Sequence, residues 1–170
     1  MTAGITIDQF LRRDYESERE CEFVDGSLEE RTGGEMAHGI LHVEVGVWFH
    51  KHRDEWKIDC LMSYSVWVSP TRIRVPDLVI TSDRLREGIR VTPPLLCVEI
   101  LSPEDEPVRL LPRLADLAAM GVANIWLLDP AQRTAFTVSE MRLERVTSTR
   151  ISVPDSPIYL DLPEIFSALD

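Results

Sequence analysis

Two acidic residues lie where a charge is costly. Asp77 follows Pro76 at the head of an apolar run, and Glu99 is the only charged residue between Leu95 and Leu101. A carboxylate inside an apolar strand loses its hydration, so it must be paired or bind a cation. Two carboxylates on neighbouring strands supply the hard oxygen ligands that divalent ions prefer. The pair of Asp77 and Glu99 therefore predicts a site for Mg²⁺ or Mn²⁺.

A site of this kind suits the hydrolysis of phosphate esters. A divalent ion activates a bound water and neutralises charge on a phosphate. A cationic side chain beside the phosphate stabilises the negative charge that develops, and Arg113 follows Glu99 on a segment with a helical pattern. The order of Asp77 and Glu99 matches the first two elements of the PD…(D/E)xK pattern of metal-dependent nucleases.

The segments around this pair are predicted to form a mixed sheet. Residues 59–69 and 72–80 are expected to be two strands joined by a proline-containing turn. Residues 95–101 are nearly all apolar, which predicts a central strand buried on both faces. Residues 109–120 carry leucines at helical spacing, and Gly121 is suited to end that helix.

The two ends of the chain carry local signals of their own. Thr6 and Gln9 form a capping box, which predicts a short helix to about residue 13. Asp25-Gly26 lies between alternating residues and predicts a hairpin. A second hairpin is expected over residues 134–146, and a last helix opens at residues 161–163.

Residues 36–52 fit two structures. Their length favours a helix, whereas their β-branched valines favour a strand. Apart from this ambiguity, the order of elements predicts one α/β domain over residues 1–170, built on a mixed sheet.

Composition limits the possible partners. The net charge is −11, which opposes nucleic-acid binding at long range. Residues 72–113, however, hold seven arginines against seven acids. Three scattered cysteines support neither a disulfide framework nor a zinc site. No apolar run approaches the ~20 residues that span a bilayer, so we expect a cytoplasmic protein without a membrane partner.

Several stretches together resemble a known family. They are CEFVDGSL, AHGIL, VPDLVI, PPLLCVEILSPED, RLADLAAMGVANIWLLDP and LPEIFSAL, which run from about residue 6 to residue 169. In this order and spacing the chain resembles the bacterial putative restriction endonuclease family with the PD-(D/E)xK fold. The resemblance implies a restriction-endonuclease-like core with helices on both faces of the sheet. It also favours a helix for residues 36–52.

The resemblance implies a role for each matching residue. Asp77 and Glu99 correspond to the metal-binding carboxylates, and Glu22 corresponds to a supporting acid near the metal. His38 corresponds to the histidine that opens the following helix. Arg113 stands where the family has a lysine. Because arginine stays protonated, it cannot act as a general base, but it can bind a phosphate through two N–H groups.

Other interpretations of these residues remain open. Glu99 could be paired with an arginine in the core, Asp77 could be a turn residue, and Glu22 could lie on an exposed strand. His38 and His42 are four residues apart, so on a helix they could share a metal.

We therefore expect a Mg²⁺- or Mn²⁺-dependent DNA endonuclease. Because a two-fold pair matches the symmetry of duplex DNA, a homodimer is expected. The alternative is a nuclease fold whose site has decayed and which serves as a binding or regulatory module. The arginine in place of the lysine and the acidic charge favour that alternative. Arg113 would then be structural, paired with Asp116 one turn along the helix.

Overall fold

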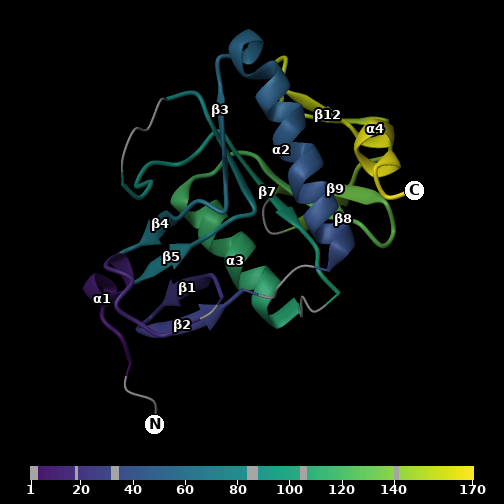
Figure 1. Cartoon of the computed structure of the whole chain (residues 1–170). Coiled ribbons are helices and arrows are strands. Elements are labelled where there is room, and N and C mark those ends of the chain that lie inside the picture. The colour runs from purple at the N-terminus through teal and green to yellow at the C-terminus, as the bar shows by residue number, and fades with distance from the viewer. Residues whose placement is uncertain (1–3, 18, 32–34, 84–87, 104–106, 140–141) are drawn as a thin grey trace.

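Helices cover both faces of a central mixed sheet (Figure 1). The computed structural model describes the chain except for residues 1–3, 18, 32–34, 84–87, 104–106 and 140–141. Helices α2 (Met36–Trp56) and α4 (Leu162–Ser167) pack on one face, and α3 (Pro107–Met120) packs on the other. This is the mixed α/β fold class expected from the sequence. The helix over residues 36–56 also settles the ambiguous segment.

The central sheet has the strand order β10-β9-β8-β7-β6-β3. Its strands are β3 (Asp59–Met62), β6 (Leu78–Thr81), β7 (Leu96–Ile100), β8 (Ile125–Asp129), β9 (Thr134–Ser139) and β10 (Arg142–Arg145). Strands β7 and β8 are parallel and α3 connects them, whereas the other neighbours are antiparallel. The expected hairpin over residues 134–146 is formed by β9 and β10.

Alternation along the central strands decides which helix each side chain meets. Ile80 and Leu96 belong to the core under α2, whereas Val79 and Cys97 belong to the core under α3. Successive side chains of a strand point to opposite faces. Glu99, two residues after Cys97, therefore faces α3 rather than α2.

A second sheet has the order β2-β1-β5-β4. Its strands are β1 (Cys21–Val24), β2 (Ser27–Glu30), β4 (Val66–Ser69) and β5 (Arg72–Arg74). The β1–β2 hairpin turns at Asp25 and Gly26, with φ of 49° and 87°, as a tight hairpin requires. Helix α1 (Ile7–Leu11) has the expected capping box, but it ends early because Arg13 adopts φ of 55°.

The two long strands expected over residues 59–69 and 72–80 are each divided in two, which corrects that prediction. Ser63 adopts φ of 47° between β3 and β4. Pro76, which has no N–H to donate, lies between β5 and β6. As a result, β3 and β6 belong to the central sheet, whereas β4 and β5 belong to the second sheet. Asp77 therefore lies where the chain crosses from one sheet to the other.

The C-terminal region adds a small two-stranded sheet that the sequence did not predict. Its strands are β11 (Arg150–Ser152) and β12 (Tyr159–Asp161), and α4 follows directly, with Asp161 as its N-cap. Among the helices of the described residues, none has the length and apolar character that crossing a membrane requires.

Candidate active site

Three buried carboxylates meet at the junction of the two sheets. Glu22 comes from β1, Asp77 directly precedes β6, and Glu99 comes from β7; each is at most 3% exposed. Strands β6 and β7 are antiparallel, with Leu78 opposite Val98. One residue further along, Asp77 lies opposite Glu99, so their side chains share one face of the sheet. Residues far apart in the sequence thus converge by strand register.

Backbone amides hold two of these carboxylates in place. The Ile100 amide donates to Asp77 Oδ2 at 2.7 Å, and the Val75 amide donates to Glu22 Oε1 at 2.9 Å. A charge-assisted bond from a backbone N–H favours the ionised carboxylate. Both carboxylates are therefore fixed in orientation before any ligand arrives.

Two histidines of α2 approach Asp77 from the other side of the junction. His42 Nε2 lies 2.7 Å from the Asp77 carbonyl oxygen, and His38 Nε2 lies 3.4 Å from Asp77 Oδ1. The two rings are one helical turn apart, with centroids separated by 5.9 Å. His42 thus binds the backbone, whereas His38 reaches the carboxylate itself.

Arg74 of β5 ties the same cluster to the second sheet. It is 1% exposed and bonds to Glu22 Oε2 at 2.7 Å, Glu29 Oε2 at 3.0 Å and Asp116 Oδ2 at 2.8 Å. A guanidinium with three carboxylate partners is fully compensated in the interior. Arg74 is therefore part of the framework on which Glu22 sits.

Arg113 reaches the cluster from α3. Its Nε lies 3.4 Å from Glu22 Oε1, and its Nη1 lies 3.5 Å from Glu99 Oε2. The side chain is 7% exposed. Asp116, one turn further on, is bound by Arg72 and Arg74. Arg113 therefore presents a positive charge directly beside two of the carboxylates.

The five residues named from the sequence thus come together in one place. They are Glu22, His38, Asp77, Glu99 and Arg113. The structure adds a sixth residue that the sequence analysis missed.

This sixth residue is Arg31, directly after β2. Its Nη2 lies 2.5 Å from Asp77 Oδ1 and 3.6 Å from Glu99 Oε2, and its Nη1 lies 3.7 Å from Glu22 Oε1. A signal for it exists in the sequence. The Asp25-Gly26 turn pairs Glu22 with Glu29, and alternation puts Arg31 on the same face as Glu29.

Burial and arginine contacts drive the pKa values of the carboxylates apart. Burial raises the pKa of Glu99 to about 7, although Arg113 and Arg31 act to lower it. Burial also acts to raise the pKa of Asp77, but Arg31, His38 and a backbone amide outweigh it and lower that pKa to about 2. The pKa of Glu22 is lowered by its arginines despite its burial.

The donor set fits a hard divalent cation. Glu99 Oε1 is buried and has no hydrogen-bond partner among the described residues. Asp77 Oδ1 and Glu99 Oε2 both lie within 3.6 Å of Arg31 Nη2, so the two carboxylates face a common point. Mg²⁺ is commonly held by one or two carboxylates and completes its shell with water.

Among the residues that the structure describes, two carboxylates, Asp77 and Glu99, face that common point. Within the ranges that the structure describes, no group of three or more His, Cys, Asp and Glu side chains is placed to hold a metal ion. Arg31 contacts all three carboxylates of the cluster instead.

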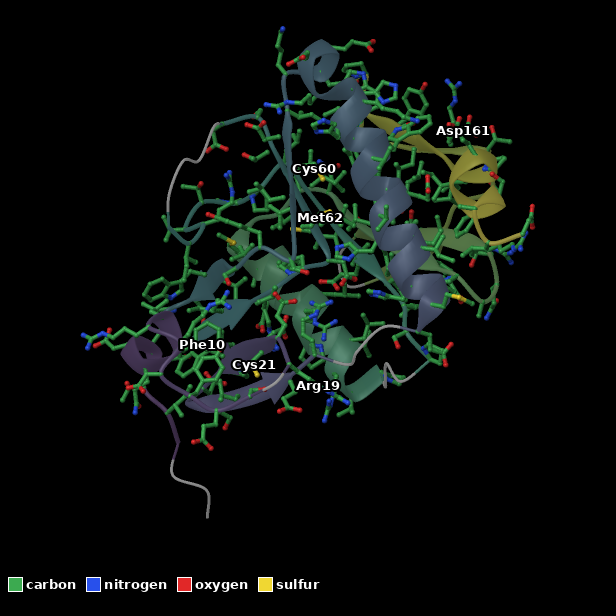
Figure 2. All side chains as sticks on the ribbon, in the orientation of Figure 1. Phe10, Arg19, Cys21, Cys60, Met62 and Asp161 are labelled. Carbon is green, nitrogen blue, oxygen red and sulfur yellow. The ribbon has the colours of Figure 1, made fainter. Side chains whose placement is uncertain are left out.

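A cleft of about 580 Å³ adjoins the cluster. Its lining includes Cys21, which precedes Glu22, and Val75, and it also includes Glu20, Arg13 and Arg19. Figure 2 shows Arg19 and Cys21 on the side of the molecule formed by α1 and the β1–β2 hairpin. Its lining also includes Tyr15 and Tyr64. The cleft thus combines positive charge with aromatic surface next to the carboxylates.

Comparison with known proteins identifies a family model and similar solved structures. The model of the Uma2 family, described as "Putative restriction endonuclease", matches residues 7–169. The fold is similar to the crystal structure of a putative nuclease of DUF820 from Anabaena variabilis. The TM-score is 0.81 at 20% sequence identity, and the likeness covers 98% of this chain and 99% of the other. None of the curated proteins matches the chain.

Proposed function

The chain belongs to the Uma2 family of putative restriction endonucleases, and from this premise we propose that it hydrolyses phosphodiester bonds of DNA with a bound Mg²⁺ or Mn²⁺ ion. The observation that carries the proposal is the pair of buried carboxylates, Asp77 and Glu99. They face one point, and Glu99 Oε1 has no hydrogen-bond partner among the residues that the structure describes.

Asp77 and Glu99 would hold the ion. A bound divalent ion would supply an activated water and neutralise charge on the phosphate. Asp77 is ready for this role, because the Ile100 amide fixes its second oxygen. Burial raises the pKa of Glu99 to about 7. At or below pH 7, Glu99 must therefore release a proton when it binds a cation.

Glu22, His38 and Arg113 would support the reaction from around the carboxylates. Glu22 holds Arg113 at 3.4 Å, so it orients the guanidinium rather than the substrate. Arg113 would donate N–H groups to a phosphate oxygen and stabilise the negative charge that develops there. His38, 3.4 Å from Asp77 Oδ1, would position that carboxylate or the water beside it.

The cleft beside the cluster gives a strand of nucleic acid a place to bind. Arg13 and Arg19 would attract the phosphates, and Tyr15 and Tyr64 offer rings on which bases can stack. Such local attraction is needed because the chain as a whole carries a net charge of −11. DNA binding should therefore weaken steeply as salt is added.

One observation favours the alternative of a decayed site. Each carboxylate of the cluster already contacts arginine: Arg31 reaches all three, and Arg113 reaches Glu22 and Glu99. A network of this kind can stand without a metal, and arginine cannot replace the proton-transfer role of a lysine. In that case the protein would bind nucleic acid or a partner without cutting.

A plasmid-nicking assay separates the two functions. The metal-free protein is supplied with Mg²⁺ or Mn²⁺ and supercoiled DNA, and wild type is compared with Asp77→Asn. Asp59→Asn is the matched control, because Asp59 is also paired with an arginine but lies outside the cluster. We expect nicking by wild type and Asp59→Asn and none by Asp77→Asn. Equal nicking by all three proteins, or none with either ion, would contradict the proposal.

A further inference from the structure

Arg31 is the one side chain that touches all three carboxylates of the cluster, among the residues that the structure describes. Its backbone amide donates to the Glu20 carbonyl oxygen at 2.8 Å, which continues the β1–β2 hairpin by one residue. From there the side chain reaches inward and is 12% exposed. Its Nη1 also donates to the Val75 carbonyl oxygen. The hairpin thus delivers a guanidinium to the centre of the junction.

The position of this guanidinium is the one that a cation shared by Asp77 and Glu99 would need. Nη2 alone lies 2.5 Å from Asp77 Oδ1 and 3.6 Å from Glu99 Oε2. An ion bound to these oxygens would lie about 2–2.6 Å from each. A nitrogen so close to Asp77 Oδ1 occupies that space. The guanidinium and the ion therefore exclude each other.

Charge balance leads to the same exclusion. Buried carboxylates need compensating positive charge. Arg31 supplies this charge to Asp77, because the ion pairs of the described residues join Asp77 to neither Arg74 nor Arg113. A divalent ion would supply the same compensation. Adding it while Arg31 stays would place two cations against one carboxylate.

Room for Arg31 to move exists beside the cluster. Val75, which accepts the second hydrogen bond of the guanidinium, lines the 580 Å³ cleft, and so does Glu20. Rotation toward the cleft is therefore the path that we infer for the side chain when it leaves the carboxylates.

We propose that Arg31 is the built-in counter-cation of the metal-free site and that a divalent ion binds only by displacing it. The inference rests on the proposed function, because it needs Asp77 and Glu99 to hold an ion. It makes Arg31 a positioning residue: it keeps the carboxylates in place without metal, and it sets how tightly the ion binds.

Calorimetric titration of the metal-free protein with MnCl₂ tests the proposal without any measurement of cleavage. Wild type is compared with Arg31→Met, which keeps an unbranched, flexible stem and removes the guanidinium with its charge. Arg53→Met is the matched control, since Arg53 pairs with Asp59 at 3.0 Å outside the cluster. We expect Arg31→Met to bind Mn²⁺ about tenfold more tightly than wild type, within the usual range for coupled sites. Arg53→Met should bind as wild type does.

Thermal unfolding gives a second readout on the same proteins. In EDTA, Arg31→Met should melt below wild type, because Asp77 loses its compensating charge. Addition of Mn²⁺ should then raise its melting temperature more than that of wild type. Should Arg31→Met fail to fold, Arg31→Lys keeps the charge but loses the paired N–H groups of arginine, and it should also bind Mn²⁺ more tightly than wild type.

The outcomes separate the inference from the function on which it rests. If Asp77→Asn loses Mn²⁺ binding while the Arg31 variants bind as weakly as wild type, the metal site stands and the role of Arg31 is wrong. Weaker Mn²⁺ binding by the Arg31 variants overturns the inference as well. If wild type and both Arg31 variants bind no Mn²⁺, the proposed function fails and the inference fails with it.

Discussion

The raised pKa of Glu99 predicts how the stability of the metal-free protein depends on pH. In the folded protein burial moves this pKa to about 7 from the usual 4.5. At a pH between these two pKa values, Glu99 is protonated in the folded state and ionised in the unfolded state. The free energy of unfolding therefore falls as the pH rises from 4.5 to 7 and levels off above 7.

The size of this effect follows from the shift. Each pKa unit corresponds to about 1.4 kcal/mol, so Glu99 should cost about 3 kcal/mol of stability between pH 4.5 and pH 8. Glu99→Gln has no proton to lose and should not show this fall. The difference between the two proteins isolates Glu99 from the groups that they share. The lowered pKa of Asp77, about 2, acts only below this pH range.

Urea unfolding in EDTA, followed by tryptophan fluorescence, measures this difference. Wild type and Glu99→Gln are compared at half-unit steps from pH 4.5 to pH 8. The free energy of unfolding of Glu99→Gln should rise relative to that of wild type as the pH rises. The difference should change by about 3 kcal/mol over the whole range. Parallel pH profiles for the two proteins would refute the argument, because Glu99 would then have the same pKa folded and unfolded.

Substitutions at three further residues test the fold and the site. Arg74→Met leaves buried Glu22 without its closest partner and should cost about 3–5 kcal/mol in urea unfolding; a loss below 1 kcal/mol would show that the network is dispensable. Gly121→Ala should cost about 1–3 kcal/mol by the same assay, since Gly121 has φ of 102° and a Cβ would lie 3.4 Å from a carbon of Pro93. Arg113→Met should slow plasmid nicking ~10²-fold or more, whereas Arg113→Lys should retain it; equal rates in all three proteins would exclude a role for Arg113 at the phosphate.

Local signals in the sequence predicted the elements well where the cause is itself local. The capping box at Thr6 and the Asp25-Gly26 turn work through neighbouring backbone groups, so both are visible in the sequence. The buried run around Glu99 likewise predicted strand β7. By contrast, the helix over residues 36–56 carries valines on several sides, so only the family resemblance decided it.

The predictions that failed depend on contacts between distant parts of the chain. Whether residues 59–69 form one strand or two depends on which sheet each half joins, and that is decided by partners elsewhere in the chain. The pairing of β1 with β5 puts Arg74 beside Glu22, and no local pattern specifies it. Arg31 is the intermediate case. The hairpin register gives its face, but its contact with Asp77 depends on how the two sheets meet.

A crystal soaked in MnCl₂ at pH 8 tests the central claim most directly. Anomalous scattering from Mn²⁺ should give a single strong peak between Asp77 and Glu99, and the Arg31 side chain should have moved away from both carboxylates. Electron density for Arg31 still bridging these carboxylates, with no anomalous peak beside them at saturating Mn²⁺, would contradict the account.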